Sequence, residues 1–511
     1  MPSSSKIVSA AEAVSRIPDG AVVSICGAWV LVPEITLKAL GTHFLETGHP
    51  RDLTAVFAIC PGDSFEQPGI EHLAHPGLLR RVIGGSYPTG PSSSQPSRLR
   101  QLIQGNQAEA YNLPSGMIAQ WYREVGAHRP GVLTRAGLGT FVDPRSHGGR
   151  MNQAATRDIV SLVEVAGTEY LFFPAFPVQA AIIRATTADE LGNLTMEHEG
   201  ATLTAFSQAA AAKASGGIVI AQVKRCAAAR SLNPHLVKVP GTLVDYIVVD
   251  SDQMQASKIR HDPAVCGEIR TPLRSDIKVP PVDRLIAARA LAAIREGDVV
   301  VLGFGISAFV PRLLLEQDRF EQVSFAIEQG STGGLPLTGF QFGSSLNPQV
   351  ILDAGSQFDL FQGGCFDVAM LSFLQIDKAG RVNVHRVNKA PHVSAGIGGF
   401  LDIVAGAKRL LFLGNLTAGG FQAEVNGATL RILNEGHNRK FVHELDQVSF
   451  DPRYSQAEEI LYITERATFR YRNGEIELAE LNPGVDLERD VLAQMEFQPK
   501  IASTLSLAAT R

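Results

Sequence analysis

The chain has 511 residues, of which 45% are hydrophobic and 19% charged, and its formal net charge at pH 7 is −5. This length predicts two or more domains, while the composition excludes a disordered protein and the lack of a basic run argues against nucleic-acid binding. Cysteines without C-x-x-C spacing, no signal peptide and no apolar run near the roughly 20 residues of a membrane span predict a cytoplasmic protein with reduced thiols.

The first segments have the pattern of an α/β unit. Residues 9–17 carry apolar side chains on one helical face, and residues 21–26 follow as a buried strand. Gly27 then opens a loop into a second helix at 32–46, with Pro33 near its start.

The same order of elements returns later in the chain. A helix is predicted at 283–297, a strand with a glycine turn at 298–305, and a leucine-rich helix at 310–317. A second similarity joins 186–196 (TTADELGNLTM) to 374–384 (LQIDKAGRVNV), each an acidic turn leading into a short alternating strand. Two matched pairs in the same order indicate two similar α/β halves related by tandem duplication.

A polar segment separates the two halves. Residues 251–281 contain four prolines, and we place the domain boundary there, near Val279. The expected domains are therefore residues 1–278 and residues 279–511.

Several strands are continuous apolar runs, namely 216–223, 244–250 and 409–416. Such runs are typical of strands buried on both faces, so we predict largely parallel sheets covered by helices, in two open α/β/α domains. Residues 460–481 differ, because they read as two antiparallel strands around an Asn473-Gly474 turn.

The stretch 322–334 (QVSFAIEQGSTGG) is the first candidate for chemistry. Its apolar residues predict a buried strand that ends on Glu328, followed at once by glycines. Open α/β sheets bind ligands at the carboxyl ends of their strands, and glycines would let a substrate approach closely. The alternative is an ordinary glutamate that caps a strand end in solvent.

A glycine turn at Gly303-Phe304-Gly305 is the second candidate. It follows a predicted strand and fits G-x-G-x-x-A, with Glu328 ending the next strand, so a dinucleotide-binding site is one interpretation. A tight β–α turn without a ligand is the other, since a single fingerprint is weak evidence.

The third candidate combines a glycine run with an amide. Backbone N–H groups of 396–399 (GIGG) could form an oxyanion hole or a simple turn, and Asn383 could polarise a carbonyl. No His-Glu-x-x-His, clustered Cys/His or calcium-loop pattern is present, so the sequence indicates no metal.

The residues around Glu328 resemble the signature of a known family. Glu328-x-Gly330-x-x-Gly333 resembles the E-x-G-x-x-G signature of family I CoA-transferases, and the chain as a whole resembles the single-polypeptide acetate or propionate CoA-transferases. In those enzymes the two subunit types of related proteins are fused, which would make 1–278 an α-type and 279–511 a β-type domain. Further similar stretches are 109–118, 129–145, 186–197, 357–371 and 485–497.

The resemblance implies roles for particular residues. Glu328 would be the nucleophile that forms a covalent glutamyl-CoA thioester, and Gly303 and Gly305 would line the CoA site. Asn383, Gly398 and Gly399 would donate to the thioester oxygen. No cofactor or metal is implied, because the CoA thioester is itself a substrate, and a homo-oligomer, a tetramer, is expected.

Two departures from the family pattern concern the substrate. Residues 26–31 (CGAWVL) stand where relatives usually have a glycine-rich loop, and Cys365 stands where a third glycine is common. We therefore expect Trp29 and Leu31 to line the acyl pocket, with burial of Trp29 under the following helix as the alternative. The function predicted is transfer of CoA from a short-chain acyl-CoA to another acid; a nucleotide-dependent oxidoreductase and a non-catalytic acyl-CoA or sugar-phosphate sensor are the alternatives.

Overall fold

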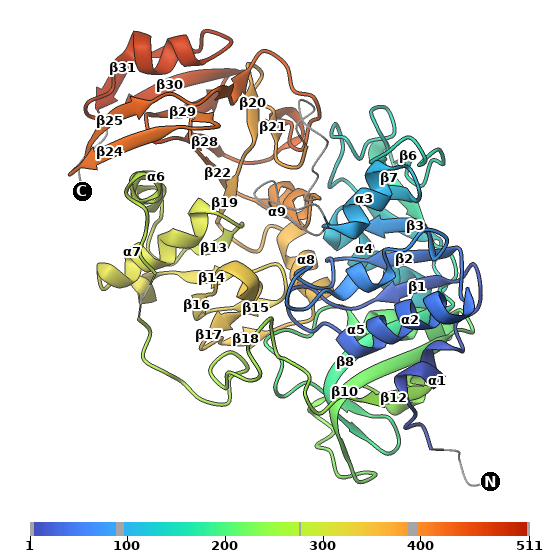
Figure 1. Ribbon diagram of the computed structural model, residues 1–511. Helices are drawn as coiled ribbons and strands as arrows, with labels where there is room; N and C mark the ends of the chain where they lie inside the picture. Colours follow the sequence, from blue (N-terminus) through green and yellow to red (C-terminus); the bar gives the residue numbers. More distant parts are fainter. Residues whose placement is uncertain (1–4, 88–96, 275–276, 387–395, 508–511) are drawn as a thin grey trace.

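The computed structural model describes residues 5–87, 97–274, 277–386 and 396–507. Two large sheets dominate the molecule, one from each half of the chain, and Figure 1 shows them side by side, the first blue to green and the second yellow to red. None of the helices in these described ranges combines the length and the apolar character that a bilayer crossing requires.

The first sheet is nine-stranded and mainly parallel. Its strands are β1 (Val22–Ile25), β2 (Leu53–Phe57), β3 (Leu79–Gly84), β4 (Glu109–Asn112), β8 (Ala180–Asp189), β9 (Leu194–Thr195), β10 (Ile218–Ala227), β11 (Val237–Val239) and β12 (Tyr246–Val249). Parallel pairing gives the order β12–β10–β8–β1–β2–β3–β4, and β9 and β11 are antiparallel additions. All ten residues of β8 are buried, which is typical of a strand covered on both faces.

Helices cover both faces of this sheet. One face packs against α1 (Ala10–Val14), α2 (Glu34–Thr47) and α3 (Arg98–Gln104), and the other against α4 (Ser115–Gly126) and α5 (Ala205–Ala214). Because side chains alternate along a strand, β8 contributes to both cores. Ala180 and Ile182 belong to the core with α1–α3, whereas Ala181 and Ile183 belong to the core with α4 and α5. Ser9 begins α1 by accepting the N–H of Glu12.

The second sheet is ten-stranded. Its strands are β13 (Val299–Leu302), β14 (Ser324–Ala326), β15 (Ser331–Thr332), β18 (Val350–Ile351), β19 (Val368–Ser372), β22 (Arg409–Leu413), β28 (Glu459–Ile463), β29 (Ala467–Arg472), β30 (Glu475–Leu481) and β31 (Lys500–Leu507). The helices α6 (Pro281–Ala292) and α7 (Val310–Glu316) cover one face, and α8 (Ala354–Gln362) and α9 (Phe400–Gly406) cover the other.

The two halves share one strand order. The parallel series β2–β1–β8–β10–β12 of the first sheet corresponds to β14–β13–β19–β22–β28 of the second. The excursion after β8 into β9 likewise corresponds to β20 (Gln375–Asp377) and β21 (Val382–Asn383), which follow β19. The predicted duplication of two largely parallel α/β/α units is confirmed. The exact division between residues 278 and 279 stays a proposal, within the segment that connects β12 to α6.

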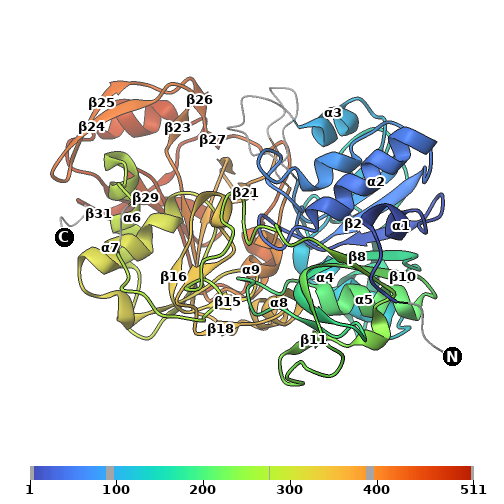
Figure 2. The same ribbon diagram turned by 60° about the horizontal axis from the view of Figure 1, so that its bottom comes forward.

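The inner helices join the two units. One core cluster contains residues of α4, α5, α8 and α9 together with the inward faces of both sheets. In Figures 1 and 2, α4, α8 and α9 lie between the two sheets, and α4 packs against α8 and α9. Arg123 of α4 adds an ion pair to Asp353 over 2.9 Å and another to Asp359 over 2.5 Å. The junction between the halves is therefore a packed apolar core with ion pairs at its edge.

Several shorter sheets are formed by the segments outside the two large sheets. They are β5 (Gly131–Thr134) with β7 (Thr168–Pro174) and β6 (Ser161–Val165); β16 (Leu335–Pro336) with β17 (Ser345–Leu346); β21 with β20 and β27 (Phe441–Val442); β23 (Thr417–Ala418) with β26 (Asn438–Arg439); and β24 (Gln422–Asn426) with β25 (Thr429–Asn434).

The carboxyl-terminal prediction was partly wrong. The hairpin around Asn473 and Gly474 is confirmed, since β29 and β30 pair antiparallel and both turn residues have positive φ. The preceding residues, however, form a separate strand, β28, that is parallel to β22 and antiparallel to β29. The break falls at buried Glu465 and Arg466, whose ion pair occupies the turn between the two strands.

Candidate active site

Glu328 lies at the tip of a tight turn at the carboxyl end of β14. The N–H of Gly330 donates to the carbonyl of Ile327 over 3.0 Å, and the N–H of Ile327 donates to the carbonyl of Ser331 over 2.9 Å. β15 then pairs antiparallel with β14. The strand thus ends at Ala326 rather than at Glu328, but the carboxylate is at the sheet edge where ligands bind in open α/β folds.

The glycines after Glu328 have positive φ and a packing role in the turn. Gly330 has φ +113°, and a Cβ on it would fall on the carbonyl oxygen of Leu352. A Cβ on Gly334 would fall on the carbonyl of Leu346. Close packing of the neighbouring β17–β18 segment therefore requires these glycines, and their role in letting a substrate approach Glu328 stays a prediction.

The glycine run 396–399 reaches Glu328 from the other side. The N–H of Gly399 donates to Oε2 of Glu328 over 2.9 Å, and a Cβ on Gly399 would lie 2.5 Å from that oxygen. The N–H of Gly398 donates instead to the carbonyl of Gly85 over 2.8 Å, and the carbonyl of Gly398 accepts from the N–H of Ser115 over 2.9 Å. The turn and Glu328 both belong to the carboxyl-terminal half. The amino-terminal half holds the turn in place while the turn presents one N–H to the Glu328 carboxylate.

The surroundings of Glu328 disfavour its charge. Burial raises the pKa of the carboxyl group, and the hydrogen bond from Gly399 opposes that rise. The amide of Gln329 adds a longer hydrogen bond of 3.3 Å to Oε1. Within the described part of the chain, no lysine or arginine forms an ion pair with this carboxylate. Glu328 is thus a partly desolvated carboxylate held by neutral donors.

A second carboxyl group, which the sequence did not indicate, lies in the same region. Asp402 is fully buried in the first turn of α9, where it accepts the N–H of Gly116 and the amide of Gln362, each over 2.8 Å. Burial, with a smaller contribution from the charge of Glu328, raises its pKa to about 7, although the two hydrogen bonds oppose the rise. A single aspartate on a helix has no sequence signature, and its partner Gly116 comes from the other half.

The turn Gly303–Gly305 follows β13 and carries an exposed side chain. Phe304 is 57% exposed, its carbonyl accepts the hydroxyl of Ser372 over 2.8 Å, and Gly305 has φ +111°. A 3-10 segment (Ile306–Phe309) follows before α7 begins. The turn therefore does not open directly into an α-helix, which a dinucleotide site requires for the pyrophosphate.

Trp29 connects this turn to the amino-terminal half. It lies in the loop after β1, and its ring centroid is 5.5 Å from that of Phe304 and 6.2 Å from that of Phe342, both edge-on. Phe304 and Phe342 are themselves 5.6 Å apart, so the three rings form an aromatic cluster across the junction. Leu31 is fully buried with φ +58°.

The aromatic cluster is connected to Glu328 through Gly343 and Gln329. Gly343, next to Phe342, packs on the side chain of Gln329, since a Cβ on Gly343 would lie 2.6 Å from its Cδ. Gln329 in turn donates to Glu328. The structure thus brings together Glu328, Gly398 and Gly399, whereas Trp29, Phe304 and Phe342 are linked to them through Gly343 and Gln329.

Asn383 is held away from this group by its own hydrogen bonds. Its amide donates to Oε1 of Gln375 over 3.0 Å and to the carbonyl of Arg386, and its carbonyl oxygen accepts two N–H groups of the same loop. No contact between Asn383 and Glu328 exists among the described residues. Its predicted role toward the thioester oxygen stays a prediction.

Known proteins with similar sequences are CoA-transferases. The family described as Coenzyme A transferase matches residues 7–250. The chain is 38% identical to caffeate CoA-transferase of Acetobacterium woodii, over 98% of this chain and 96% of that protein. It is 37% identical to acetate CoA-transferase YdiF of Escherichia coli (strain K12), over 99% of this chain and 94% of the relative.

Solved structures agree over the whole length. The apoenzyme of the acyl-CoA transferase YdiF from Escherichia coli O157:H7 superposes with a TM-score of 0.92 at 35% identity, covering 100% of this chain and 96% of the other. A structure of that protein described as a thioester complex with CoA gives a TM-score of 0.91 at 35% identity, covering 99% and 95% of the two chains.

Proposed function

The chain belongs to the coenzyme A transferase family, and we propose that it moves CoA from a short-chain acyl-CoA, such as acetyl-CoA, to another carboxylic acid, such as propionate or butyrate. The observation that carries this proposal is the meeting of Glu328 with the N–H of Gly399 at the junction of the two halves, 2.9 Å apart. A carboxylate and a fixed donor at one point are what an acyl relay needs.

The relay proceeds through two covalent species. An oxygen of Glu328 attacks the carbonyl carbon of the acyl-CoA, the carbon–sulfur bond breaks, and a mixed anhydride and CoA thiolate result. The thiolate then attacks the glutamyl carbonyl, which releases the first acid as its carboxylate and leaves a glutamyl-CoA thioester. The acceptor carboxylate repeats both steps in reverse, so the thioester bond energy is conserved and the kinetics are ping-pong.

The environment of Glu328 suits a nucleophile. Partial burial makes the charged carboxylate less stable than in water, which favours its consumption by acylation, and neutral donors keep it oriented. Gly399 offers its N–H where the oxyanion of each tetrahedral intermediate develops. Gly398 supports this turn through its bond to Gly85, and Asn383 is a further proposed donor. Water exclusion by the packed junction limits hydrolysis.

The remaining parts of the site concern recognition. Gly303 and Gly305 are proposed to line the CoA path, with Phe304 exposed between them. Trp29, backed by Phe304 and Phe342, is proposed to limit the acid side of the pocket, and buried Leu31 to shape the loop that carries it. One relative is named for caffeate, an aromatic acid, and another for acetate. We therefore propose that Trp29, Phe304 and Phe342 select acids by their size.

The cellular setting is also a proposal. The substrates are acyl-CoA and small carboxylic acids, no further cofactor is required by the relay, and the protein is proposed to act in the cytoplasm as a homotetramer. Light scattering of the purified chain measures the last point, and a mass other than four chains would contradict it.

One assay tests the proposed reaction. The purified protein is mixed with acetyl-CoA and propionate, and the products are separated by chromatography. We expect propionyl-CoA and acetate to form in equal amounts without net loss of thioester. Acetyl-CoA consumed with release of free CoA, or no reaction with any acid from acetate to caffeate, would contradict the proposal.

A further inference from the structure

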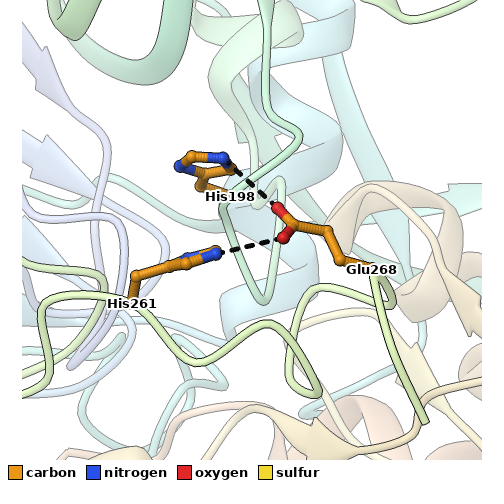
Figure 3. Close-up of side chains that lie close together, drawn as sticks. All are labelled: His198, His261 and Glu268. Atoms are coloured by element: carbon orange, nitrogen blue, oxygen red, sulfur yellow. Dashed lines mark hydrogen bonds and ion pairs between the residues drawn. The ribbon is translucent and has the colours of Figure 1, made fainter.

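Three side chains of metal-ligand type meet outside the Glu328 site. His198 follows β9, whereas His261 and Glu268 belong to the segment that connects β12 to α6. Figure 3 shows the two imidazoles on one side of the Glu268 carboxylate: Nε2 of His198 is 3.2 Å from Oε1, and Nε2 of His261 is 3.2 Å from Oε2. The two rings are 4.2 Å apart between centroids.

One glutamine holds the two histidine segments together. The amide of Gln255 donates to the carbonyl of His198 over 2.7 Å, and its oxygen accepts the N–H of Asp262, next to His261, over 2.9 Å. Gln255 is itself buried. The approach of the two imidazoles is therefore fixed by the backbone and does not depend on a bound ion.

We propose that His198, His261 and Glu268 bind a divalent transition-metal ion such as Zn²⁺, with a fourth position open to water. Two imidazole nitrogens and a carboxylate are a donor set that zinc accepts, with metal–ligand bonds of about 2.0–2.2 Å. Four ligands at that distance in a tetrahedron lie about 3.4 Å apart. The nitrogen–oxygen separations of 3.2 Å in the metal-free protein already approach this spacing.

The two imidazole nitrogens also select among metal ions. Magnesium and calcium prefer oxygen ligands, so these ions are poor candidates for a site with two nitrogens.

Two features limit the affinity. Nδ1 of both histidines is shielded from solvent and lacks a hydrogen-bond partner among the described residues, so neither ring has the acceptor that usually orients a metal-bound imidazole. In addition, a guanidinium nitrogen of Arg225 lies 3.4 Å from Nε2 of His198. Arg225 also binds Glu197 over 2.7 Å, which offsets part of its charge.

A bound ion would act on the junction of the two halves. The segment that supplies His261 and Glu268 also contacts the second half: the carbonyl of Ala264 accepts the N–H of Asn347 over 2.9 Å, and the side chain of Asn347 accepts the N–H of Thr271 over 3.0 Å. Metal binding would tie this connecting segment to the β9 loop and so hold both halves in place. The site is structural, since the relay on Glu328 uses none of its atoms.

Calorimetric titration with Zn²⁺ tests the site, using the full chain without a histidine tag. We expect one ion per chain and a higher melting temperature with Zn²⁺ than with Mg²⁺. Co²⁺ should give the visible absorption of a four-coordinate nitrogen and oxygen site without a thiolate band, which separates this site from the exposed Cys226 and Cys365.

Variants locate the binding. His261→Ala and Glu268→Gln should each weaken Zn²⁺ binding at least tenfold, and Arg225→Ala should strengthen it because a neighbouring cation is removed. His443→Ala, which removes an exposed histidine of the second half, should leave the affinity unchanged. His261→Ala and Glu268→Gln change different ligands, so the test does not depend on one variant folding. A wild-type chain that binds no ion, or equal affinity in all four variants, would overturn the proposal.

Discussion

The backbone N–H of Gly399 donates to Oε2 of Glu328 over 2.9 Å, and a side chain at Gly399 would meet the same oxygen. This contact joins a turn of the second half, which the first half holds through Gly85 and Ser115, to the carboxylate that is proposed to carry the acyl group. The catalytic geometry therefore depends on the packing of the two halves, and most of the predictions below follow from that dependence.

Gly399→Ala should remove most transferase activity. The new methyl group would lie 2.5 Å from Oε2 of Glu328 and 2.6 Å from the ring of Phe358, so it displaces the carboxylate from its donor. Loss of one oxyanion donor costs on the order of 10²–10³ in kcat. Steady-state kinetics measure the loss, and denaturant unfolding shows whether the fold survives. Gly126→Ala, where a Cβ makes only ordinary contacts of 3.4 Å, is the control. Equal kcat in both variants would contradict the proposed role of Gly399.

Asp402→Asn should change how stability depends on pH. The pKa of Asp402 is raised from 3.8 to about 7 by burial, so the folded state keeps its proton where the unfolded state has lost it. Its favourable contribution is complete below pH 4 and lost as the pH rises through 7. The asparagine variant lacks this loss, so its stability relative to wild type should increase by about 3 kcal/mol between pH 4 and pH 7.

Denaturant unfolding across that pH range measures the difference. Asparagine can keep both hydrogen bonds if the amide of Gln362 turns over, so the substitution is conservative in shape. A constant stability difference at all pH values would show that Asp402 is ionised in the folded protein.

Gly330→Ala should destabilise the protein far more than an ordinary glycine substitution. Gly330 has φ +113° and no space for a Cβ beside the Leu352 carbonyl, so strain and overpacking add, at about 3 kcal/mol or more. Gly427→Ala is the matched control, because Gly427 has φ +60° with nothing within 4 Å and should cost about 1 kcal/mol. Chemical denaturation compares the two. A smaller loss at Gly330 than at Gly427 would mean that the Glu328 turn can relax.

Trp29→Gly should change the ranking of acceptor acids. Its ring packs on Phe304 and Phe342, next to the Gln329 that contacts Glu328, so removing it enlarges the acid side of the proposed pocket. Apolar pockets discriminate by about 1–3 kcal/mol per methylene. The kcat/KM values for propionate and butyrate should therefore rise about tenfold or more relative to the value for acetate. Phe206→Ala, on an exposed residue of α5, is the control. If the variant keeps the wild-type ranking, Trp29 serves packing alone.

Much of the fold could be predicted because local pattern decides it. The apolar runs of β10 and β22 specify strands buried on both faces, and the repeated order of elements specifies two similar units. The pattern does not show that α4 and α5 of one unit would pack on α8 and α9 of the other, since that depends on which of two buried faces carries the complementary side chains. The turn at Glu465 and Arg466 was missed because an ion pair, not glycine or proline, forms it.

Some residues of the candidate site could likewise be predicted from the sequence, and others could not. Glu328 and Gly399 could be found because they lie in short glycine-rich motifs, whereas Asp402 could not, because Gly116 and Gln362, which make it a buried partner of Glu328, lie elsewhere in the chain. The histidine pair at 198 and 261 was missed for the same reason, since only the connecting segment brings the two side chains together.

The most direct test of the proposed relay is the mass of the peptide that contains Glu328. Wild-type protein is incubated with acetyl-CoA in the absence of an acceptor acid, digested at low pH and analysed by mass spectrometry. We expect Glu328 to carry CoA as a thioester that disappears when propionate is added, and Glu328→Ala to lose transfer while it still binds CoA, because the carboxylate supplies chemistry and little affinity. Wild-type turnover by Glu328→Ala, or a CoA adduct on another residue, would contradict the account.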